Sequence, residues 1–344
     1  MSDERGVRLL LEDGERASRH AGLHRLEGAR LLITGASGLI GLNLLATLAA
    51  ARAAGVSTDV FASIHRPPSD TLTRVARAAR AQVRASDLST PQGVEELPSA
   101  DIVIHAAGSG DPGVFLGRKA ETLSIGACAT LALIRRLPPD GRLLFLSSSE
   151  VYQGLQGTAD ESMCGTTSPQ HPRSAYIEAK RCGEAACAAG RDAGRSATVA
   201  RLAITYGPGG RLGDTRVVNA LIERSLRDSA TRLLDEGAAI RTLIYTRDAS
   251  ELLWRIALEG TEAVYNVAGE TVVSVKAMAQ VIAGETNCRL ELGRGDGAPG
   301  AAREVRLDLT RTLGEFPKAD FVGLEDGIAR TAEWYRSLMG ATVQ

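Results

Sequence analysis

The stretch Leu31–Leu48, "LLITGASGLIGLNLLATL", joins a short apolar run to a helical pattern through three glycines. The run predicts a buried strand, and Leu39–Ala54 predicts a helix rich in alanine and leucine. The glycines between them have the spacing GxxGxxG. Glycine permits a tight turn and lets backbone N–H groups approach a pyrophosphate, while the helix N-terminus supplies positive potential. The stretch therefore predicts a dinucleotide-binding turn. Its predicted contact residues are Gly35, Ser37, Gly38, Leu39, Ile40 and Gly41.

The alternation of strands and helices continues along the chain. Further strands are predicted at Asp59–Ile64, Asp101–His105, Arg142–Ser147 and Thr198–Leu202, with a last one near Ala263–Ala268. Helices are predicted from about Ser69 to Ala81, at Phe115–Leu137 and at Ala175–Ala193. Strands that alternate with helices of this length indicate βαβ units and a parallel sheet. The predicted fold class is α/β, with a doubly wound parallel Rossmann sheet and a smaller C-terminal α/β substrate-binding lobe.

The regular pattern decays after Tyr206, at the glycine-rich stretch "GPGGRLGDTR". We therefore expect the dinucleotide-binding domain to span residues 29–207 and to be completed by residues 242–269. Residues 208–241 and 270–344 are expected to form the substrate-binding lobe. Residues 1–28 are expected to be a polar N-terminal extension, for which a short helix is one option.

Composition excludes several classes of partner. The 344 residues carry 40 lysines and arginines against 41 acids, which gives no electrostatic reason to expect nucleic acid or a membrane surface. No apolar run approaches the ~20 residues that span a bilayer. The N-terminal residues are too charged for a signal peptide. Five cysteines without metal-ligand spacing predict reduced thiols, no metal site and a cytoplasmic protein.

Three pairs of residues follow the ends of predicted strands, at the edge where doubly wound sheets bind ligands. His65 and Arg66 follow the second strand, Asp87 and Leu88 the third, and Ala106 and Ala107 the fourth; all are predicted to contact the cofactor. An acid at the end of the second strand usually binds the ribose of NAD, whereas a nearby arginine accommodates the extra phosphate of NADP. This chain has no such acid, so Arg66 leaves NADP open beside NAD.

Catalytic side chains are predicted from "LFLSSSEVY" and "SAYIEAKR". Tyr176 and Lys180 lie four residues apart on a predicted helix and so share a face. Both are also predicted to contact the cofactor. A lysine ammonium near a phenol lowers its pKa and lets it exchange a proton beside a hydride transfer. Ser148 and Glu150 come at the end of the preceding strand, where a hydroxyl reaches both a phenol and a substrate oxygen.

These motifs, in register from about Arg30 to Arg336, resemble the extended short-chain dehydrogenase/reductases that act on nucleotide sugars. The resemblance implies an NAD-dependent epimerase/dehydratase-type enzyme that oxidises a sugar hydroxyl, usually at C4. It also implies a nucleotide-sugar substrate, NAD as the cofactor, and a homodimer formed through Phe115–Leu137 and Ala175–Ala193.

Within that family the UDP-glucuronate decarboxylases are most similar, through Pro172–Arg181, Ser148–Tyr152, the stretch Arg216–Asn219 and Arg241. The resemblance implies that Ser148 orients the sugar, Tyr176 is the base and Glu150 is a carboxylate at the reaction centre. The substrate contacts that it implies are Ser149, Arg173, Arg216, Asn219 and Arg241.

The loop Gly108–Gly117 departs from the proline-rich loop of the decarboxylases and is expected close to the sugar. A 4,6-dehydratase, in which Glu150 would abstract a proton, and an epimerase therefore remain alternatives to a decarboxylase. A non-catalytic dinucleotide-binding sensor on the same fold is the alternative from another class. The Tyr176/Lys180 pair argues against it.

Overall fold

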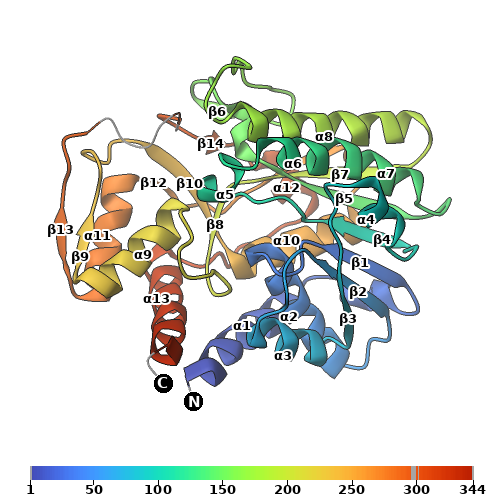
Figure 1. The fold of residues 1–344 in the computed structure, drawn as a ribbon, viewed down its shortest axis with the longest axis horizontal. Helices are drawn as coiled ribbons and strands as arrows, with labels where there is room; N and C mark the ends of the chain where they lie inside the picture. Colours follow the sequence, from blue (N-terminus) through green and yellow to red (C-terminus); the bar gives the residue numbers. More distant parts are fainter. Residues whose placement is uncertain (1, 296–299, 301, 343–344) are drawn as a thin grey trace.

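A seven-stranded parallel sheet forms the centre of the computed structural model, which describes residues 2–295, 300 and 302–342. The strand order is β11-β7-β5-β4-β1-β2-β3, and it reverses direction between β1 and β4 (Figure 1). The strands are β1 (Arg30–Thr34), β2 (Asp59–Ile64), β3 (Ala81–Ala85), β4 (Ile102–His105), β5 (Arg142–Ser148), β7 (Ser196–Leu202) and β11 (Val264–Val267). The predicted doubly wound sheet is confirmed, with strand boundaries within two residues of those expected.

Both faces of the sheet are buried, because successive strand residues point to opposite sides. Leu31 and Ile33 pack in one core cluster, and Leu32 packs with Val103 in the other. Helices cover the two faces (Figure 1). On one side lie α2 (Leu39–Ala53), α3 (Asp70–Ala78) and α10 (Thr246–Glu259); on the other lie α4 (Pro91–Glu95), α6 (Lys119–Ser124), α7 (Thr130–Arg135) and α8 (Ser174–Asp192).

The N-terminal residues are more than the polar extension expected for residues 1–28. Ser2–Ser18 form helix α1, which packs against α2 and the C-terminal helix α13 (Leu324–Thr342). Leu9 and Leu10 are buried in the core. Gly14 lies so close to α2 that an added Cβ would stand 2.4 Å from the carbonyl oxygen of Ala46. The buried apolar face of α1 was not expected from the sequence, because charged residues on the other face of the helix make the segment polar in composition.

The helix expected at Phe115–Leu137 is present from Lys119 to Arg135, so it begins later than expected and contains a π-helical turn. Pro112–Phe115 form a separate short helix, α5, and α6 begins only at Lys119. Ile125–Ala129 then adopt a π-helical turn between α6 and α7. Gly126 stands against α8 there, because a Cβ would meet the carbonyl oxygen of Ala179 at 2.3 Å. The helix expected from Ser69 to Ala81 also ends earlier, at Ala78, since Arg80 turns the chain in a left-handed conformation (φ 51°) into β3.

The remaining elements build a smaller part on one side of the sheet (Figure 1). A three-stranded sheet contains β8 (Ile204–Tyr206), β10 (Ile240–Tyr245) and β12 (Val272–Ser274). Two-stranded pairs join β9 (Ala230–Arg232) to β13 (Arg289–Glu291), and β6 (Thr158–Ala159) to β14 (Arg306–Leu307). The helices here are α9 (Val217–Asp228) and α11 (Val275–Thr286), together with α13, whereas α12 (Thr310–Glu315) packs against β11 at the edge of the central sheet. The division into a dinucleotide-binding domain and a substrate-binding lobe stays a prediction. Within the described residues, no helix is long and apolar enough to cross a membrane.

Candidate active site

The glycine turn between β1 and α2 forms one end of a cavity of about 1650 Å³. Gly35 has a positive φ of 68°, and an added Cβ would stand 2.5 Å from the carbonyl oxygen of Ala106. A Cβ on Gly41 would lie equally close to the carbonyl oxygen of Gly35. Gly38 precedes α2 without a side-chain cap, so the first N–H groups of the helix have no side-chain acceptor from that residue. All six residues predicted in this turn line the cavity.

The other predicted cofactor residues line the same cavity: His65, Arg66, Asp87, Leu88, Ala106 and Ala107. His65 approaches Asp87, with 3.9 Å between Nδ1 and a carboxylate oxygen. Ser89 donates to the Asp87 carboxylate through its hydroxyl and its backbone N–H, which lowers the pKa of that carboxyl. A turn without room for a Cβ, an uncapped helix N-terminus and four strand ends fit NAD. Gly35–Gly41 would hold its pyrophosphate.

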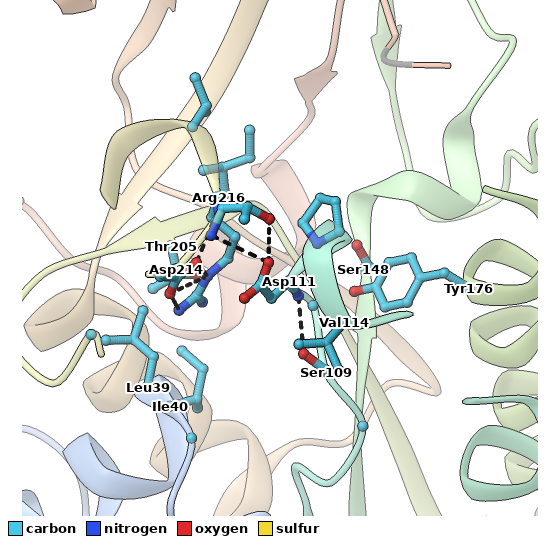
Figure 2. Close-up of a pocket in the computed structure, with 18 of the residues that line it drawn as sticks. Leu39, Ile40, Ser109, Asp111, Val114, Ser148, Tyr176, Thr205, Asp214 and Arg216 are labelled. Atoms are coloured by element: carbon cyan, nitrogen blue, oxygen red, sulfur yellow. Dashed lines mark hydrogen bonds and ion pairs between the residues drawn. The ribbon is translucent and has the colours of Figure 1, made fainter. Parts of the chain in front are cut away.

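Tyr176, Lys180 and Ser148 come together from two elements. Ser148 ends β5, while Tyr176 and Lys180 stand one turn apart on α8. Figure 2 shows the Ser148 and Tyr176 side chains next to each other, and the Ser148 hydroxyl acts to lower the pKa of the phenol. Lys180 donates from Nζ to the carbonyl oxygen of Leu146 at 2.7 Å. The sequence therefore identified three side chains that the fold brings into one cavity.

The electrostatics of Tyr176 differ from the sequence expectation. Burial and, to a smaller extent, the Glu150 carboxylate raise its pKa to about 12, against the opposing effect of Ser148. Burial lowers the pKa of Lys180 to about 8, against the attraction of Glu184. Lys180 Nζ lies 5.7 Å from the centre of the Tyr176 ring and donates a hydrogen bond to the backbone of Leu146 instead of to the phenol. The expectation that Lys180 lowers the phenol pKa is therefore wrong for this state of the chain.

Glu150 and Arg173 form an ion pair beside Tyr176. The Arg173 guanidinium donates to both carboxylate oxygens, with 2.8 Å between Nε and Oε2. The same guanidinium stands over the ring of Phe115, 5.2 Å from its centre, and Phe115 stacks on Tyr176 at 4.4 Å. The resemblance implied a role at the reaction centre for Glu150 and a role in binding substrate for Arg173. In the fold the two side chains form an ion pair.

The other predicted substrate contacts divide into two groups. Ser149, Arg216 and Arg241 line the cavity. Arg241 lies in β10 with burial lowering its pKa, donates to the carbonyl oxygen of Ile240 at 2.8 Å and forms no ion pair within the described part of the chain. Arg216 is paired with Asp214. Asn219 is buried and donates to Asp214 at 3.0 Å without lining the cavity, so its contact with a substrate stays a prediction.

Three residues around the site were not predicted, and two of them, Asp111 and Trp334, line the cavity. Phe115 had no motif around it, and Asp111 lies in the loop that departs from the decarboxylase pattern. Trp334 on α13 lines the cavity and donates from its indole N–H to the carbonyl oxygen of Gly210 at 2.6 Å. These contacts join residues about 60 to 120 positions apart in the sequence, so no local signal marks them.

Comparison with known proteins agrees with this geometry. The UDP-glucuronic acid decarboxylase 5 of Arabidopsis thaliana is 28% identical over 320 residues, 90% of each chain. The dTDP-4-dehydro-6-deoxy-D-allose reductase of Streptomyces bikiniensis is 27% identical over 327 residues, 91% of this chain and 98% of that one. A solved structure of MoeE5 in complex with UDP-glucuronic acid and NAD is 26% identical with a TM-score of 0.71, over 89% of this chain and 99% of that one.

The family model described as the NAD dependent epimerase/dehydratase family matches residues 31–268, from β1 to just beyond β11. This range contains the glycine turn, Ser148, Tyr176 and Lys180. The resemblance found in the sequence is confirmed, and the chain belongs to the NAD dependent epimerase/dehydratase family.

Proposed function

We propose that this chain is an NAD-dependent enzyme that oxidises a nucleotide-bound uronic acid at C4 and then decarboxylates it. The observation that carries the proposal is that Ser148 and Tyr176 lie together (Figure 2) beside the Glu150–Arg173 ion pair in one cavity. The similarity to a UDP-glucuronic acid decarboxylase, and to MoeE5 in complex with UDP-glucuronic acid and NAD, supports this substrate class. A 4,6-dehydratase or an epimerase is the alternative reaction.

Tyr176 is the group that takes the proton from the C4 hydroxyl. With a pKa of about 12, its phenol keeps its own proton at neutral pH unless positive charge is added beside it. NAD supplies, when bound, the hydride acceptor and a positively charged nicotinamide ring. The Ser148 hydroxyl lies beside the phenol of Tyr176 (Figure 2), where it orients the sugar oxygen. Lys180 keeps α8 against β5 through its bond to Leu146.

Glu150 and Arg173 favour decarboxylation over dehydration. Oxidation of a uronic acid at C4 gives a β-keto acid, whose C5–C6 electron pair moves into the carbonyl as carbon dioxide leaves. C5 then needs a proton, and no base has to remove one. Because Arg173 binds both oxygens of Glu150, this carboxylate is oriented rather than free to abstract a C5 proton, as a dehydratase requires.

Arg241 supports an anionic substrate. The Glu150–Arg173 pair is neutral as a unit, whereas Arg241 is a buried guanidinium with no carboxylate paired to it in the described chain. A buried charge without a partner is costly, and an anionic ligand group offsets that cost. We propose that Arg241 binds the diphosphate or the carboxylate of the substrate.

Mass spectrometry tests the reaction with UDP-glucuronic acid, UDP-glucose and dTDP-glucose as probes. Loss of carbon dioxide from UDP-glucuronic acid is the expected result; loss of water or an unchanged mass would replace the proposal by dehydration or epimerisation. Tyr176→Phe is the control, because it removes the proton acceptor and little volume. It is expected to lower turnover by at least ~10²-fold while NAD still binds.

Glu150→Gln distinguishes decarboxylation from dehydration. In a decarboxylase the variant is expected to release carbon dioxide at a reduced rate, since the β-keto acid breaks down without this carboxylate. In a dehydratase it would stop after oxidation and accumulate reduced nicotinamide with an intact keto-sugar, and this result would overturn our choice. Absorbance of the reduced nicotinamide distinguishes the outcomes.

A further inference from the structure

One buried carboxylate joins two opposite walls of the cavity. Asp111 lies in the loop after β4, and Thr215 and Arg211 lie in the turn before α9. One oxygen of Asp111 accepts from the backbone N–H of Thr215 at 3.3 Å and from the Thr215 hydroxyl. Its other oxygen accepts from Arg211 at 2.8 Å. Figure 2 shows Asp111 between Arg216 and Asp214 on one side and Val114 on the other.

The same carboxylate also orders its own loop. Its first oxygen accepts the N–H of Gly113 at 3.0 Å, and that N–H also donates to the Thr215 hydroxyl at 2.8 Å. Four of the ten residues from Gly108 to Gly117 are glycine, so the loop loses much conformational entropy on becoming ordered. The Asp111 side chain is only 7% exposed, although Arg211 is 46% exposed. The buried contacts of Asp111 to Gly113 and Thr215 therefore contribute more than the exposed contact to Arg211. We call the contacts that join the loop 108–117 to the turn 211–216 the Asp111 tie.

This tie reaches the proton-transfer tyrosine through one aromatic ring. Asp111 caps α5, and α5 ends at Phe115, which stacks on Tyr176 with an interplanar angle of 12°. Gly110, one residue before Asp111, is close enough that an added Cβ would stand 3.4 Å from the Tyr176 hydroxyl. The loop that Asp111 orders thus forms the wall against the reactive phenol.

We propose that Asp111 is a positioning residue. It fastens the loop 108–117 to the turn 211–216, and through Phe115 it fixes the orientation of Tyr176. Its effect on turnover rests on the function proposed above, whereas its tie between the two segments does not. A tie of this kind predicts that two segments about 100 residues apart loosen together when one carboxylate is removed.

Amide hydrogen exchange, read by mass spectrometry on peptides covering 109–117 and 212–219, tests the tie without any substrate. Asp111→Ala is expected to speed exchange in both peptides. Asp111→Asn keeps an acceptor for Gly113 and Thr215 and is expected to restore most of the protection. Thr215→Val, which removes the hydroxyl that contacts both Asp111 and the N–H of Gly113, is expected to loosen 109–117. If either Asp111→Ala or Thr215→Val loosens only its own segment, the proposal is wrong.

Asp101→Ala is the matched control. Asp101 precedes the same strand, β4, at its other end, and is hydrogen-bonded to Arg30 away from the cavity. The same chemical change there is expected to leave exchange in both peptides unchanged. Accelerated exchange in both peptides in this control would mean that the loosening is a general effect of removing charge, and it would overturn the assignment to Asp111.

Turnover of UDP-glucuronic acid measures the consequence for catalysis. Asp111→Ala is expected to lower kcat by about tenfold to a hundredfold, the scale of a misplaced reacting group. The KM for NAD is expected to change little, because the glycine turn lies at the other end of the cavity. Asp111→Asn is expected to recover most of kcat, and an unchanged kcat in Asp111→Ala overturns the positioning role. Should the wild type turn over no sugar nucleotide, the proposed function fails, while the exchange experiment still decides whether Asp111 ties the segments.

Discussion

His105 is a buried histidine whose hydrogen bonds fix it in the neutral form. The Thr34 hydroxyl accepts the N–H of Ala107, so its own proton points to His105 Nδ1 at 2.7 Å. The ring then carries its proton on Nε2, which faces the carbonyl oxygen of Ile125 at 3.4 Å. Burial and the nearby charge of Lys180 lower the pKa of His105 to about 4.

This histidine predicts a loss of stability in mild acid. Below pH 6.5 the unfolded chain binds a proton at His105, but the folded chain does so only near pH 4. Its contribution to the unfolding free energy is thus fully present above pH 6.5 and falls as the pH drops toward 4. The total is about 3 kcal/mol. Urea unfolding from pH 7 to 4.5 measures the slope, and His105→Gln is expected to flatten it. Equal slopes for both proteins would exclude His105 as the cause.

At the scale of elements, two glycines let α8 lie close to the sheet and to the π-helical turn. An added Cβ on Gly183 would stand 2.2 Å from the Phe145 ring, and one on Gly126 would stand 2.3 Å from the backbone of Ala179. This close approach lets Lys180 reach the backbone of Leu146 on β5. The position of Tyr176 and Lys180 therefore depends on Gly183 and Gly126 having no side chain.

Gly183→Ala is expected to push α8 away from β5 because the added methyl group has no space. Overpacking of this kind costs about 1–3 kcal/mol of unfolding free energy. Turnover should fall more than the affinity for NAD, since the glycine turn lies on other elements. Gly284→Ala in α11 is the control, because no atom lies within 4 Å of its added Cβ. Thermal unfolding and NAD titration of both variants check this, and equal stability of the two would contradict it.

At the scale of the whole molecule, α6 to α8 lie together on one side (Figure 1). Leu123 is 39% exposed there, and Cys128 and Cys182 are exposed as well. Because the resemblance implies assembly through these helices, we propose a two-fold homodimer that covers them.

Light scattering at micromolar concentration is expected to give twice the chain mass of 36.2 kDa. Cys182→Arg, which places a charge on the proposed contact, is expected to shift the protein toward the monomer. Cys164, which is also exposed but precedes α8, provides the control through Cys164→Arg. A wild-type protein that scatters as a single chain would refute the dimer.

The sequence predicted best what local patterns determine. The glycine turn, the strands around it and the Tyr176/Lys180 spacing are each encoded within about twenty residues, and the fold contains them where expected. The buried face of α1 was missed because charged residues dominate its composition. The Asp111–Thr215 contact joins residues 104 positions apart, and the pairing of Glu150 with Arg173 depends on how α8 meets β5. Such contacts follow only from the tertiary arrangement.

The contact between Trp334 and Gly210 gives the protein an optical reporter of its own. The chain has two tryptophans, and Trp254 is fully buried in the core with no hydrogen-bond partner for its indole N–H among the described residues. Trp254 therefore senses only unfolding. Trp334 lines the cavity and is bonded to the turn that leads to Arg211, so its emission responds to whatever moves that turn. A change in intrinsic fluorescence without unfolding would thus report a ligand arriving, with no label attached.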